Sequence, residues 1–381
     1  MFSEVERRQL FPVTGSWAYL NHAAVGPLPL PVLEAAKNYL TRCSQEGEHH
    51  WERTGPLLEE LRGRLAGSLH CQGDEVTFTR NVSEGISFLA SGLDWKPGDN
   101  VILPAIEFPA NVYPWLNQAM AGVETRFLPV INGVFSLADL EKAVDTRTRV
   151  VSISAVQFFG GFRAPLRAIG EFCRSRGILF CVDAIQFLGA GIIDVTAENI
   201  DYLACGGHKW LMAGEGIGFI YCRADLAERL RPGNVGWQGV KQWLDFSDLR
   251  LDFQPGARRF TTGTVSAVGL HMLAASWSFL ESIGWSAITA QVTHLARLTA
   301  RLAQDHHWQP VIGPEEVASG IVSFRVPHPD LLRLVSDLRD RGIQISAREG
   351  ALRVSPQFYN TDLEIERLFQ TLEHLIPSAR Q

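Results

Sequence analysis

The chain has 381 residues, a net charge of −6 and a hydrophobic fraction of 46%. This length exceeds what one hydrophobic core usually supports, so we expect two domains with large buried cores. The net negative charge and the absence of a basic stripe argue against nucleic-acid binding. The first residues contain no apolar stretch, and no later run approaches about 18 apolar residues, so we expect neither secretion nor membrane insertion.

Strand-like and helix-like segments alternate in the first part of the chain. Alternation of this kind predicts a mostly parallel α/β sheet covered by helices, with ligands bound at the carboxyl ends of the strands. The predicted segments are a strand running into a helix over 76–86, strand 101–104, helix 109–120, strand 150–155, helix 166–176, strand 178–182 and strands 200–205 and 217–222.

The second part of the chain begins with an irregular segment, 234–263, rich in Gly, Asp, Trp and Arg, which is typical of a connection that lines a site. We expect an N-terminal segment 1–18 that packs on a small domain, a large domain over 19–264, and a connecting helix with a small C-terminal α/β domain over 265–381. The predicted segments after the irregular connection are helices 265–283 and 286–305, strand 321–326, helix 330–341, strands 343–346 and 351–354, and helix 362–375.

Two charged residues follow short apolar strands. Asp183 ends the segment 177–182, and Lys209 follows 200–205 through two glycines. A carboxylate at a buried strand end needs a partner, which is either the turn that it caps or the protonated pyridine nitrogen of pyridoxal phosphate (PLP). A lysine amine can hold the aldehyde of that cofactor as a Schiff base. The pair therefore predicts a PLP site.

Neighbouring residues extend this site. Gln186 stands three residues after Asp183, where it reaches the phenolic oxygen of the ring, and His208 could donate to a phosphate. Asn81 and Glu84 resemble a capping pair at the start of a helix, and the free amides of such a helix can bind an anion. We therefore expect a phosphate cup at this helix.

The whole set resembles the class V aminotransferase family of fold-type I PLP enzymes, which includes cysteine desulfurases, kynureninase and isopenicillin N epimerase-like proteins. The resemblance runs from about residues 19–24 to about residues 353–356, and its elements occur in the order found in the family. It implies a PLP-dependent transferase fold with a mostly parallel seven-stranded sheet in the large domain. It also implies a homodimer with shared active sites.

Carried over by position, the resemblance assigns cofactor contacts to Val82, Ser83, Phe108, Gln157, Asp183, Gln186, His208, Lys209, Trp237 and Thr264. It assigns substrate contacts to Arg353, Asn21 and His22. Lys209 and Asp183 would be the catalytic pair, Phe108 would stack on the ring, and Thr264 would reach the phosphate in the neighbouring subunit. Arg353 matches the arginine that clamps the substrate carboxylate.

The chain also departs from its relatives. Desulfurases carry a mobile loop with a nucleophilic cysteine shortly before the clamp arginine, whereas the segment 345–352 has no cysteine and little room for a loop. Phe108 replaces the histidine of desulfurases, and Gly206 stands where many relatives have a hydroxyl residue. These differences argue against persulfide chemistry.

The six cysteines form no CxxC pair, and several lie in strand-like runs, so we expect reduced thiols in a cytoplasmic protein. The adjacent pairs His49–His50 and His306–His307 do not share a helix face, so we expect no metal site. Arg163 is either a surface charge or a second anion contact.

We expect an amino acid as the small-molecule substrate and amino-group transfer as the reaction, passing through an imine between substrate and cofactor. A C–S or C–C lyase acting on Cβ or Cγ is the second choice, and epimerisation uses the same kind of imine. From another class, a PLP-fold protein could bind a ligand without turnover. The presence of Lys209, Asp183, His208 and Arg353 argues against this last alternative.

Overall fold

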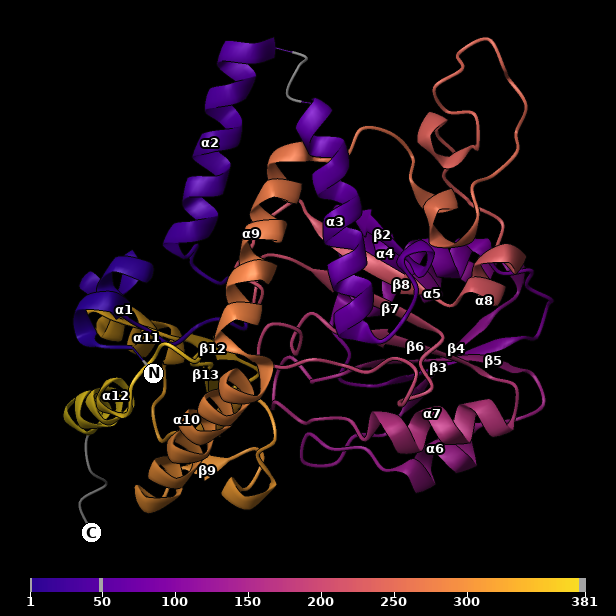
Figure 1. Cartoon of the computed structure of the whole chain (residues 1–381). Coiled ribbons are helices and arrows are strands. Elements are labelled where there is room, and N and C mark those ends of the chain that lie inside the picture. The colour runs from indigo at the N-terminus through magenta and orange to yellow at the C-terminus, as the bar shows by residue number, and fades with distance from the viewer. Residues whose placement is uncertain (1, 48–50, 377–381) are drawn as a thin grey trace.

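The computed structural model describes residues 2–47 and 51–376, and a seven-stranded sheet forms the centre of this part of the chain (Figure 1). The strands are β2 (Val76–Thr79), β3 (Asn100–Pro104), β4 (Glu124–Leu128), β5 (Thr148–Ser154), β6 (Leu179–Asp183), β7 (Tyr202–Gly206) and β8 (Gly218–Cys222). Their order is β2-β8-β7-β6-β5-β3-β4. β8 runs antiparallel to both neighbours, and the other adjacent pairs are parallel. The predicted mostly parallel α/β fold is confirmed.

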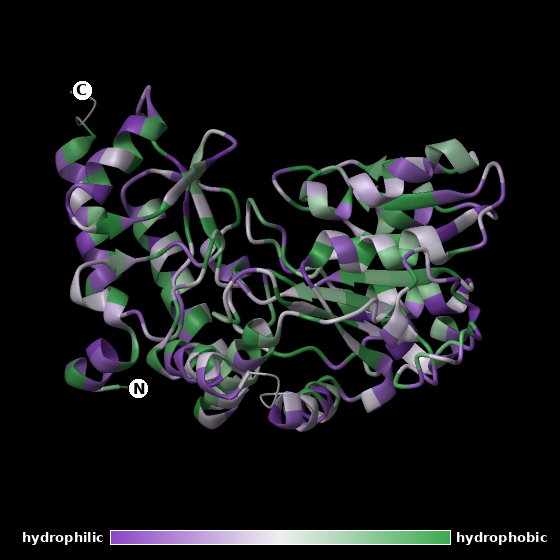
Figure 2. Ribbon diagram, turned by 90° about the horizontal axis from the view of Figure 1, so that it is seen from above, coloured by the Kyte–Doolittle hydropathy of each residue, from purple (hydrophilic) through white to green (hydrophobic). Residues whose placement is uncertain are grey.

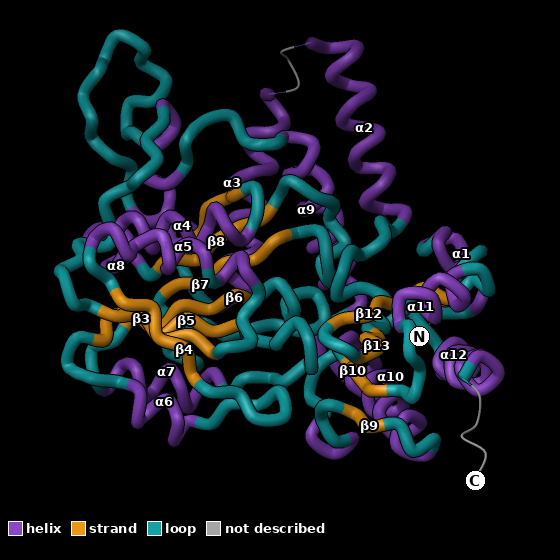
Figure 3. The backbone as a smooth tube through the Cα atoms, turned by 180° about the vertical axis from the view of Figure 1, so that it is seen from behind, coloured by secondary structure: helices purple, strands orange, loops and turns teal. Residues whose placement is uncertain are grey.

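Helices cover both faces of this sheet, with α6 and α7 on one side and α4, α5 and α8 on the other (Figure 3). Three longer helices, α2, α3 and α9, pack beside the sheet, where α9 contacts both of the others (Figure 1). The bounds are α2 (Leu30–Glu46), α3 (Trp51–Leu69), α4 (Val82–Gly92), α5 (Tyr113–Leu116), α6 (Leu137–Ala143), α7 (Leu166–Ser175), α8 (Ala224–Arg229) and α9 (Ala267–Ile283).

The C-terminal part forms a second layer built on a four-stranded sheet of order β12-β13-β10-β9. A separate parallel pair joins β1 to β11 and so ties the N-terminal region to this part. The bounds are β1 (Ala18–Tyr19), α10 (Trp285–Asp305), β9 (Gln309–Pro310), β10 (Val322–Arg325), α11 (Leu331–Arg339), β11 (Ile343–Gln344), β12 (Ser346–Arg348), β13 (Ala351–Val354) and α12 (Asp362–Leu375).

Buried apolar side chains form three clusters. Along β6, Phe180 and Val182 belong to the cluster on one face of the large sheet and Cys181 to the cluster on the other, because successive strand residues point to opposite faces. The apolar residues of these strands lie in the interior of the molecule (Figure 2). The third cluster is made by α10, α11, α12 and the four-stranded sheet. We propose on this basis to keep the division at residues 18 and 264, with α9 as the connecting helix that packs on the large domain.

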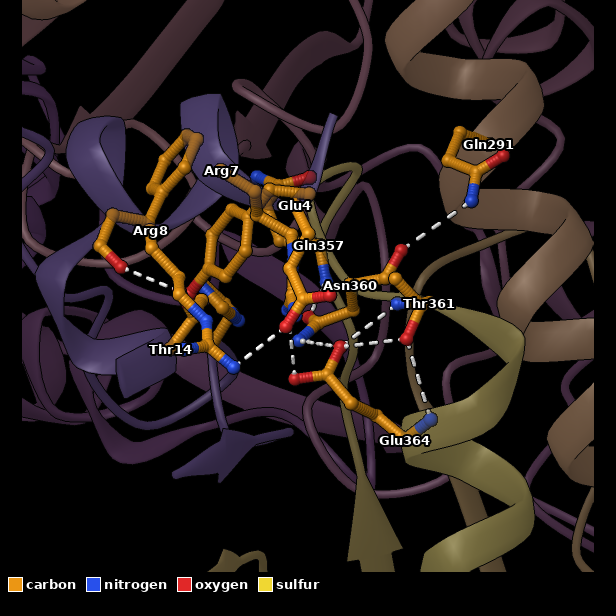
Figure 4. Close-up of polar contacts among 12 residues, drawn as sticks. Glu4, Arg7, Arg8, Thr14, Gln291, Gln357, Asn360, Thr361 and Glu364 are labelled. Carbon is orange, nitrogen blue, oxygen red and sulfur yellow. Dashed lines mark hydrogen bonds and ion pairs between the residues drawn. The ribbon is translucent and has the colours of Figure 1, made fainter. Parts of the chain in front are cut away.

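The N-terminal helix α1 (Glu4–Leu10) packs on this C-terminal part (Figure 4). Arg7 pairs with Glu364 of α12 at 3.2 Å, and Phe11 stacks on Tyr359 with ring centroids 3.9 Å apart. Nearby, Gln357 donates through Nε2 to the carbonyl of Trp210 at 3.1 Å. The segment 357–364, which contacts the N-terminal region, thus also fixes the backbone next to Lys209.

Two predicted elements differ in detail. The helix predicted over 109–120 is broken into a 3-10 turn, the short α5 and a second 3-10 turn, because Pro114 lacks the amide that a continuous helix needs inside its length. The strand predicted over 343–346 is divided between two sheets, since β11 pairs with β1 and β12 pairs with β13. No helix in the described ranges has the length and apolar character required to cross a membrane.

Candidate active site

A cavity of about 330 Å³ lies where several strands of the large sheet end. This volume is near the lower end of the range of about 300–1,000 Å³ typical of small-molecule sites. Val82 follows β2, Asp183 ends β6, and Lys209 follows β7, and all three line the cavity. Parallel strands thus bring together residues that are far apart in sequence.

Lys209 lies in a tight turn held by the N-terminal region. The amide of Gly26 donates to the carbonyl of His208 at 2.8 Å, and a Cβ at Gly26 would lie 2.0 Å from the carbonyl oxygen of Lys209, so only glycine fits there. The Lys209 side chain is 8% exposed, with Nζ 5.3 Å from the ring centroid of Phe108. Burial lowers the pKa of Lys209 to about 8, although the charge of Asp183 opposes this shift.

Asp183 is 2% exposed, and its Oδ1 accepts a hydrogen bond from the amide of Ile185 at 3.0 Å. Burial raises the pKa of Asp183 to about 7, the nearby Glu107 adds to the shift, and Lys209 opposes it. Buried carboxylates of this kind require a cationic partner to remain ionised. A protonated ring nitrogen would supply one.

Glu107 is a second buried carboxylate, and no sequence pattern pointed to it. It accepts hydrogen bonds from the amide of Ser154 at 2.7 Å, from Nδ2 of Asn111 at 3.0 Å and from Nε2 of Gln157 at 2.6 Å. Burial raises the pKa of Glu107 in spite of these donors. The carboxylate therefore anchors Gln157 behind the cavity.

The two glutamines of the predicted site have different surroundings. Gln186 lines the cavity, but its amide donates to the carbonyl of Ala23 at 3.0 Å and accepts from Nε1 of Trp210 at 2.9 Å. Gln157 is fully buried behind the cavity lining, and its Oε1 has no hydrogen-bond partner among the described residues. The predicted contact of either glutamine with the cofactor stays a prediction.

The start of α4 provides an anion site. Oδ1 of Asn81 accepts from the amide of Glu84 at 2.9 Å, whereas the carboxylate of Glu84 binds Arg80 and does not close a reciprocal capping box. Helix geometry leaves the amides of Val82 and Ser83 without intrahelical partners, and both residues line the cavity with His208. Burial lowers the pKa of His208, which keeps the ring neutral and able to donate one hydrogen bond.

Two arginines line the cavity from the hairpin formed by β12 and β13. Arg353 is 2% exposed, donates through Nη1 to the carbonyl of Phe158 at 2.7 Å, and pairs with no carboxylate among the described residues. Burial and the charge of Arg348 lower the pKa of Arg353 to about 10. A buried guanidinium without a counter-ion is suited to bind a carboxylate. Arg348, which the sequence analysis did not single out, also lines the cavity.

Two aromatic side chains form a wall of the cavity. Phe108 is 43% exposed and meets Phe158 edge to face, with ring centroids 5.4 Å apart. Both rings line the cavity. A flat cofactor ring between the phosphate site at α4 and the arginines would contact this wall.

Asn21 and His22 lie outside the cavity lining. His22 is fully buried, its Nδ1 lies 3.2 Å from the carbonyl of Ser355, and its Nε2 accepts from the Tyr359 hydroxyl at 2.9 Å. Burial lowers the pKa of His22 to about 3. The side chain of His22 is therefore neutral and committed to the packing between the N-terminal region and the C-terminal part. We propose for it a positioning role.

Trp237 and Thr264 line a different cavity, of about 660 Å³, between α3 and the irregular segment 234–263. Trp237 is 45% exposed and packs against Trp243 at a ring distance of 5.5 Å. Within one chain these residues and Lys209 do not meet. Their predicted contact with the cofactor therefore requires another copy of the chain.

The remaining candidates lie away from the lining. Arg163 donates to the carbonyl of Ala155 at 3.0 Å and stacks on Phe187 at 3.8 Å. His306 binds Glu373, while His49 and His50 lie outside the described residues.

No cluster of three metal-ligating side chains occurs in the ranges 2–47 and 51–376. None of the six cysteines lines the cavity, and Cys173, Cys181, Cys205 and Cys222 are buried.

These observations fit PLP. A phosphate would meet the free amides at the start of α4, a pyridine nitrogen would meet Asp183, and an aldehyde would meet the buried amine of Lys209. Without such a ligand, Asp183 and Lys209 are buried, and the amides of Val82 and Ser83 have no intrahelical partner. The donor set is therefore complementary to the cofactor that the sequence predicted.

Comparison with known proteins gives the family. The model of the Aminotransferase class-V family matches residues 18–368. A probable cysteine desulfurase of Methanothermobacter thermautotrophicus is 29% identical over 98% of this chain and 98% of its own length. The uncharacterized aminotransferase YcbU of Bacillus subtilis is 28% identical over 94% of each chain. The apo structure of cysteine desulfurase from Thermococcus onnurineus NA1 has a TM-score of 0.90 at 26% identity and covers 99% of this chain and 98% of that chain. The chain thus belongs to the class V aminotransferase family of PLP-dependent enzymes, and PLP is its cofactor.

Proposed function

We propose that this enzyme transfers the amino group of a small α-amino acid to a 2-oxo acid. The observation that carries the proposal is that Lys209 is, apart from the two arginines, the one titratable group of the described lining left to move a proton at the substrate. Asp183 is assigned to the ring nitrogen and His208 to the phosphate. Bound PLP supplies an electron-accepting ring that acidifies the substrate Cα.

Each residue then has a defined part. Lys209 would hold the cofactor and would carry the Cα proton of the substrate, and a pKa of about 8 suits a group that both accepts and releases a proton close to neutral pH. Arg353 binds the α-carboxylate and so fixes the direction of the Cα–H bond. Phe108 covers the ring face and excludes water.

The arrangement offers no thiol relay. The hairpin turn before Arg353 consists of Glu349 and Gly350, with φ of 46° and 72°, which is the two-residue turn that joins antiparallel strands most tightly. A turn of this length leaves no mobile loop, and no cysteine lies in it. Transfer of sulfur to an enzyme cysteine is therefore not part of the proposal.

Single-turnover product analysis tests the proposal. An aminotransferase given an amino acid without acceptor should release about one equivalent of 2-oxo acid per subunit, release no ammonia, and continue only when another 2-oxo acid is added. Lys209→Ala, loaded with cofactor, should release none. Continuous formation of ammonia without acceptor would contradict amino-group transfer.

A C–S lyase is the second candidate, because two of the compared proteins are described as cysteine desulfurases. Such an enzyme would release sulfide and a 2-oxo acid from cysteine continuously and without an acceptor. The elimination itself needs only the Cα proton transfer that Lys209 could perform, because hydrosulfide is a stable leaving group. Sulfide release in the same assay separates the candidates.

We also propose that the active enzyme is a homodimer in which Thr264 and Trp237 complete the site of the neighbouring copy. The support is their distance from the cavity of Lys209 and the exposed apolar side chains of the segment that carries them. These exposed side chains are Val235, Trp237, Leu244, Phe246, Leu249 and Leu251. Exposed apolar surface of this kind favours a subunit interface.

Mixing two inactive variants tests this arrangement. Lys209→Ala and Thr264→Ala each damage every site of their own homodimer, whereas a mixed dimer contains one site with both residues intact. Random mixing should therefore restore about a quarter of the wild-type activity, since half of the dimers are mixed and half of their sites are intact. If Thr264 served its own chain, mixing would restore none. An active monomer in sedimentation would also contradict the proposal.

A further inference from the structure

The cavity lining carries more positive than negative side chains. Its described residues include one carboxylate, Asp183, and three basic side chains, those of Lys209, Arg348 and Arg353. Under the proposed function, Lys209 bonds to the cofactor and Asp183 pairs with its ring nitrogen, while the phosphate lies at the start of α4. Two guanidinium groups then remain for the substrate, and an α-carboxylate satisfies one of them.

The hairpin explains why both arginines face the same space. Ser346 lies opposite Arg353, and Arg348 lies opposite Ala351. Side chains two residues apart on a strand share a face, so Arg348 and Arg353 project from the same face as diagonal neighbours, at a distance of about 7–8 Å between backbones. The tight turn at Glu349 and Gly350 fixes this register.

The two guanidinium groups differ in environment. Arg353 is buried and anchored by Phe158 and Ser346, whereas Arg348 is exposed and its side chain donates only to the carbonyl of Ala347, at 2.7 Å. No carboxylate pairs with Arg348 within the described ranges, although ion pairs are common on the rest of the surface. A rigid guanidinium suits the invariant α-carboxylate, and an adjustable one suits a group on the variable side chain.

The structure assigns to Arg348 the recognition of a second anionic group on the substrate, so that the preferred substrates are short α-amino acids with an acidic side chain. This inference rests on the proposed function. The cavity of about 330 Å³ also holds the cofactor, which limits the length of the side chain. Asp183 is the single carboxylate of the described lining, and its assignment to the ring nitrogen leaves no repulsion against a second anion.

Matched amino acids measure this recognition. L-aspartate with L-asparagine, and L-glutamate with L-glutamine, differ in charge at nearly constant size. Their dissociation constants follow from titration of the visible band of the bound cofactor, which does not require turnover, and kcat/KM is measured in parallel. The wild type should prefer the acid of at least one pair by about tenfold or more, as expected for a charge-assisted hydrogen bond.

Three variants locate the effect. Arg348→Gln should bring the acid and the amide within about twofold, mainly by weakening the binding of the acid, while Arg348→Lys should keep part of the preference. Arg325→Gln is the control, because Arg325 is exposed on β10 of the same small sheet and does not line the cavity. It should keep the wild-type preference.

The outcomes are distinguishable. A wild type that binds both members of each pair equally, or an Arg348→Gln variant that keeps the preference, overturns the inference and leaves amino-group transfer standing. If no amino acid perturbs the cofactor band of a loaded and folded wild type, the proposed function fails, and the inference fails with it. A preference that Arg325→Gln also abolishes would show a general charge effect and overturn the assignment to Arg348.

Discussion

Replacing Asp183 by Asn should stabilise the cofactor-free protein and impair the loaded enzyme. The carboxyl group is 2% exposed, and its pKa is raised from 3.8 to about 7 by burial and by Glu107. Because the native state binds this proton more tightly than the unfolded state, stability falls as the pH rises from about 4 to about 7. Above that range the full cost of the buried charge is present.

The size of the effect follows from the shift. A change of about three pKa units, which already includes the opposing charge of Lys209, corresponds to about 4 kcal/mol, and burial of the asparagine amide offsets part of the gain. We therefore expect cofactor-free Asp183→Asn to be more stable than the wild type by about 1–3 kcal/mol at pH 8, and by less at pH 5. The variant gains stability because it no longer buries a charge, and it loses function because that charge serves the cofactor.

Urea unfolding of both cofactor-free proteins at the two pH values measures this difference. Asp99→Asn is the control, because Asp99 is also buried but pairs with Arg149 at 2.8 Å, so its neutralisation should destabilise the protein at pH 8. Added PLP should stabilise the wild type more than Asp183→Asn. A destabilised Asp183→Asn protein at pH 8, or a gain of equal size at both pH values, would refute the reasoning.

Three further predictions concern the site. Lys209→Ala should lose the visible band of the bound cofactor while its circular dichroism shows a folded protein; an unchanged visible spectrum would contradict the Schiff-base assignment. Arg353→Ala should cost about 2–5 kcal/mol in kcat/KM for amino acids and leave the visible band intact, and unchanged kinetics would remove its role as carboxylate clamp. Each cysteine replaced by Ser or Ala should retain turnover, and one variant that abolishes it without unfolding would reopen sulfur transfer; the positions are Cys43, Cys71, Cys173, Cys181, Cys205 and Cys222.

The sequence was sufficient for the fold and for the residues at strand ends. Asp183 and Lys209 each follow a short apolar run, and neighbouring parallel strands bring their carboxyl ends to the same edge. The start of α4 was also accessible, because Asn81 is a capping residue by type and position. In these cases the residues next to each site residue are enough to identify it, and only the pairing of the strands depends on contacts between distant parts of the chain.

Other features depend on distant contacts. Glu107 lies in a loop after β3, where glutamate is ordinarily exposed, and it is buried only because Ser154 and Gln157 from the next strand along the sheet close over it. Arg348 has the local pattern of an exposed hairpin residue, and the cavity beside it is created by another part of the chain. Neither residue carries a signal in its immediate sequence.

The two arginines and the buried acid–base pair together explain how one cavity can be selective at both ends. Asp183 and Lys209 are costly to bury without a ligand, so the binding energy of PLP offsets a charge arrangement that the fold alone does not favour. Under the proposed assignments, bound cofactor would pair these charges and leave the unpaired positive charge at the hairpin of Arg348 and Arg353. The electrostatic attraction that remains is therefore directed at the substrate, and the number of anionic groups on the substrate decides how much of it is used.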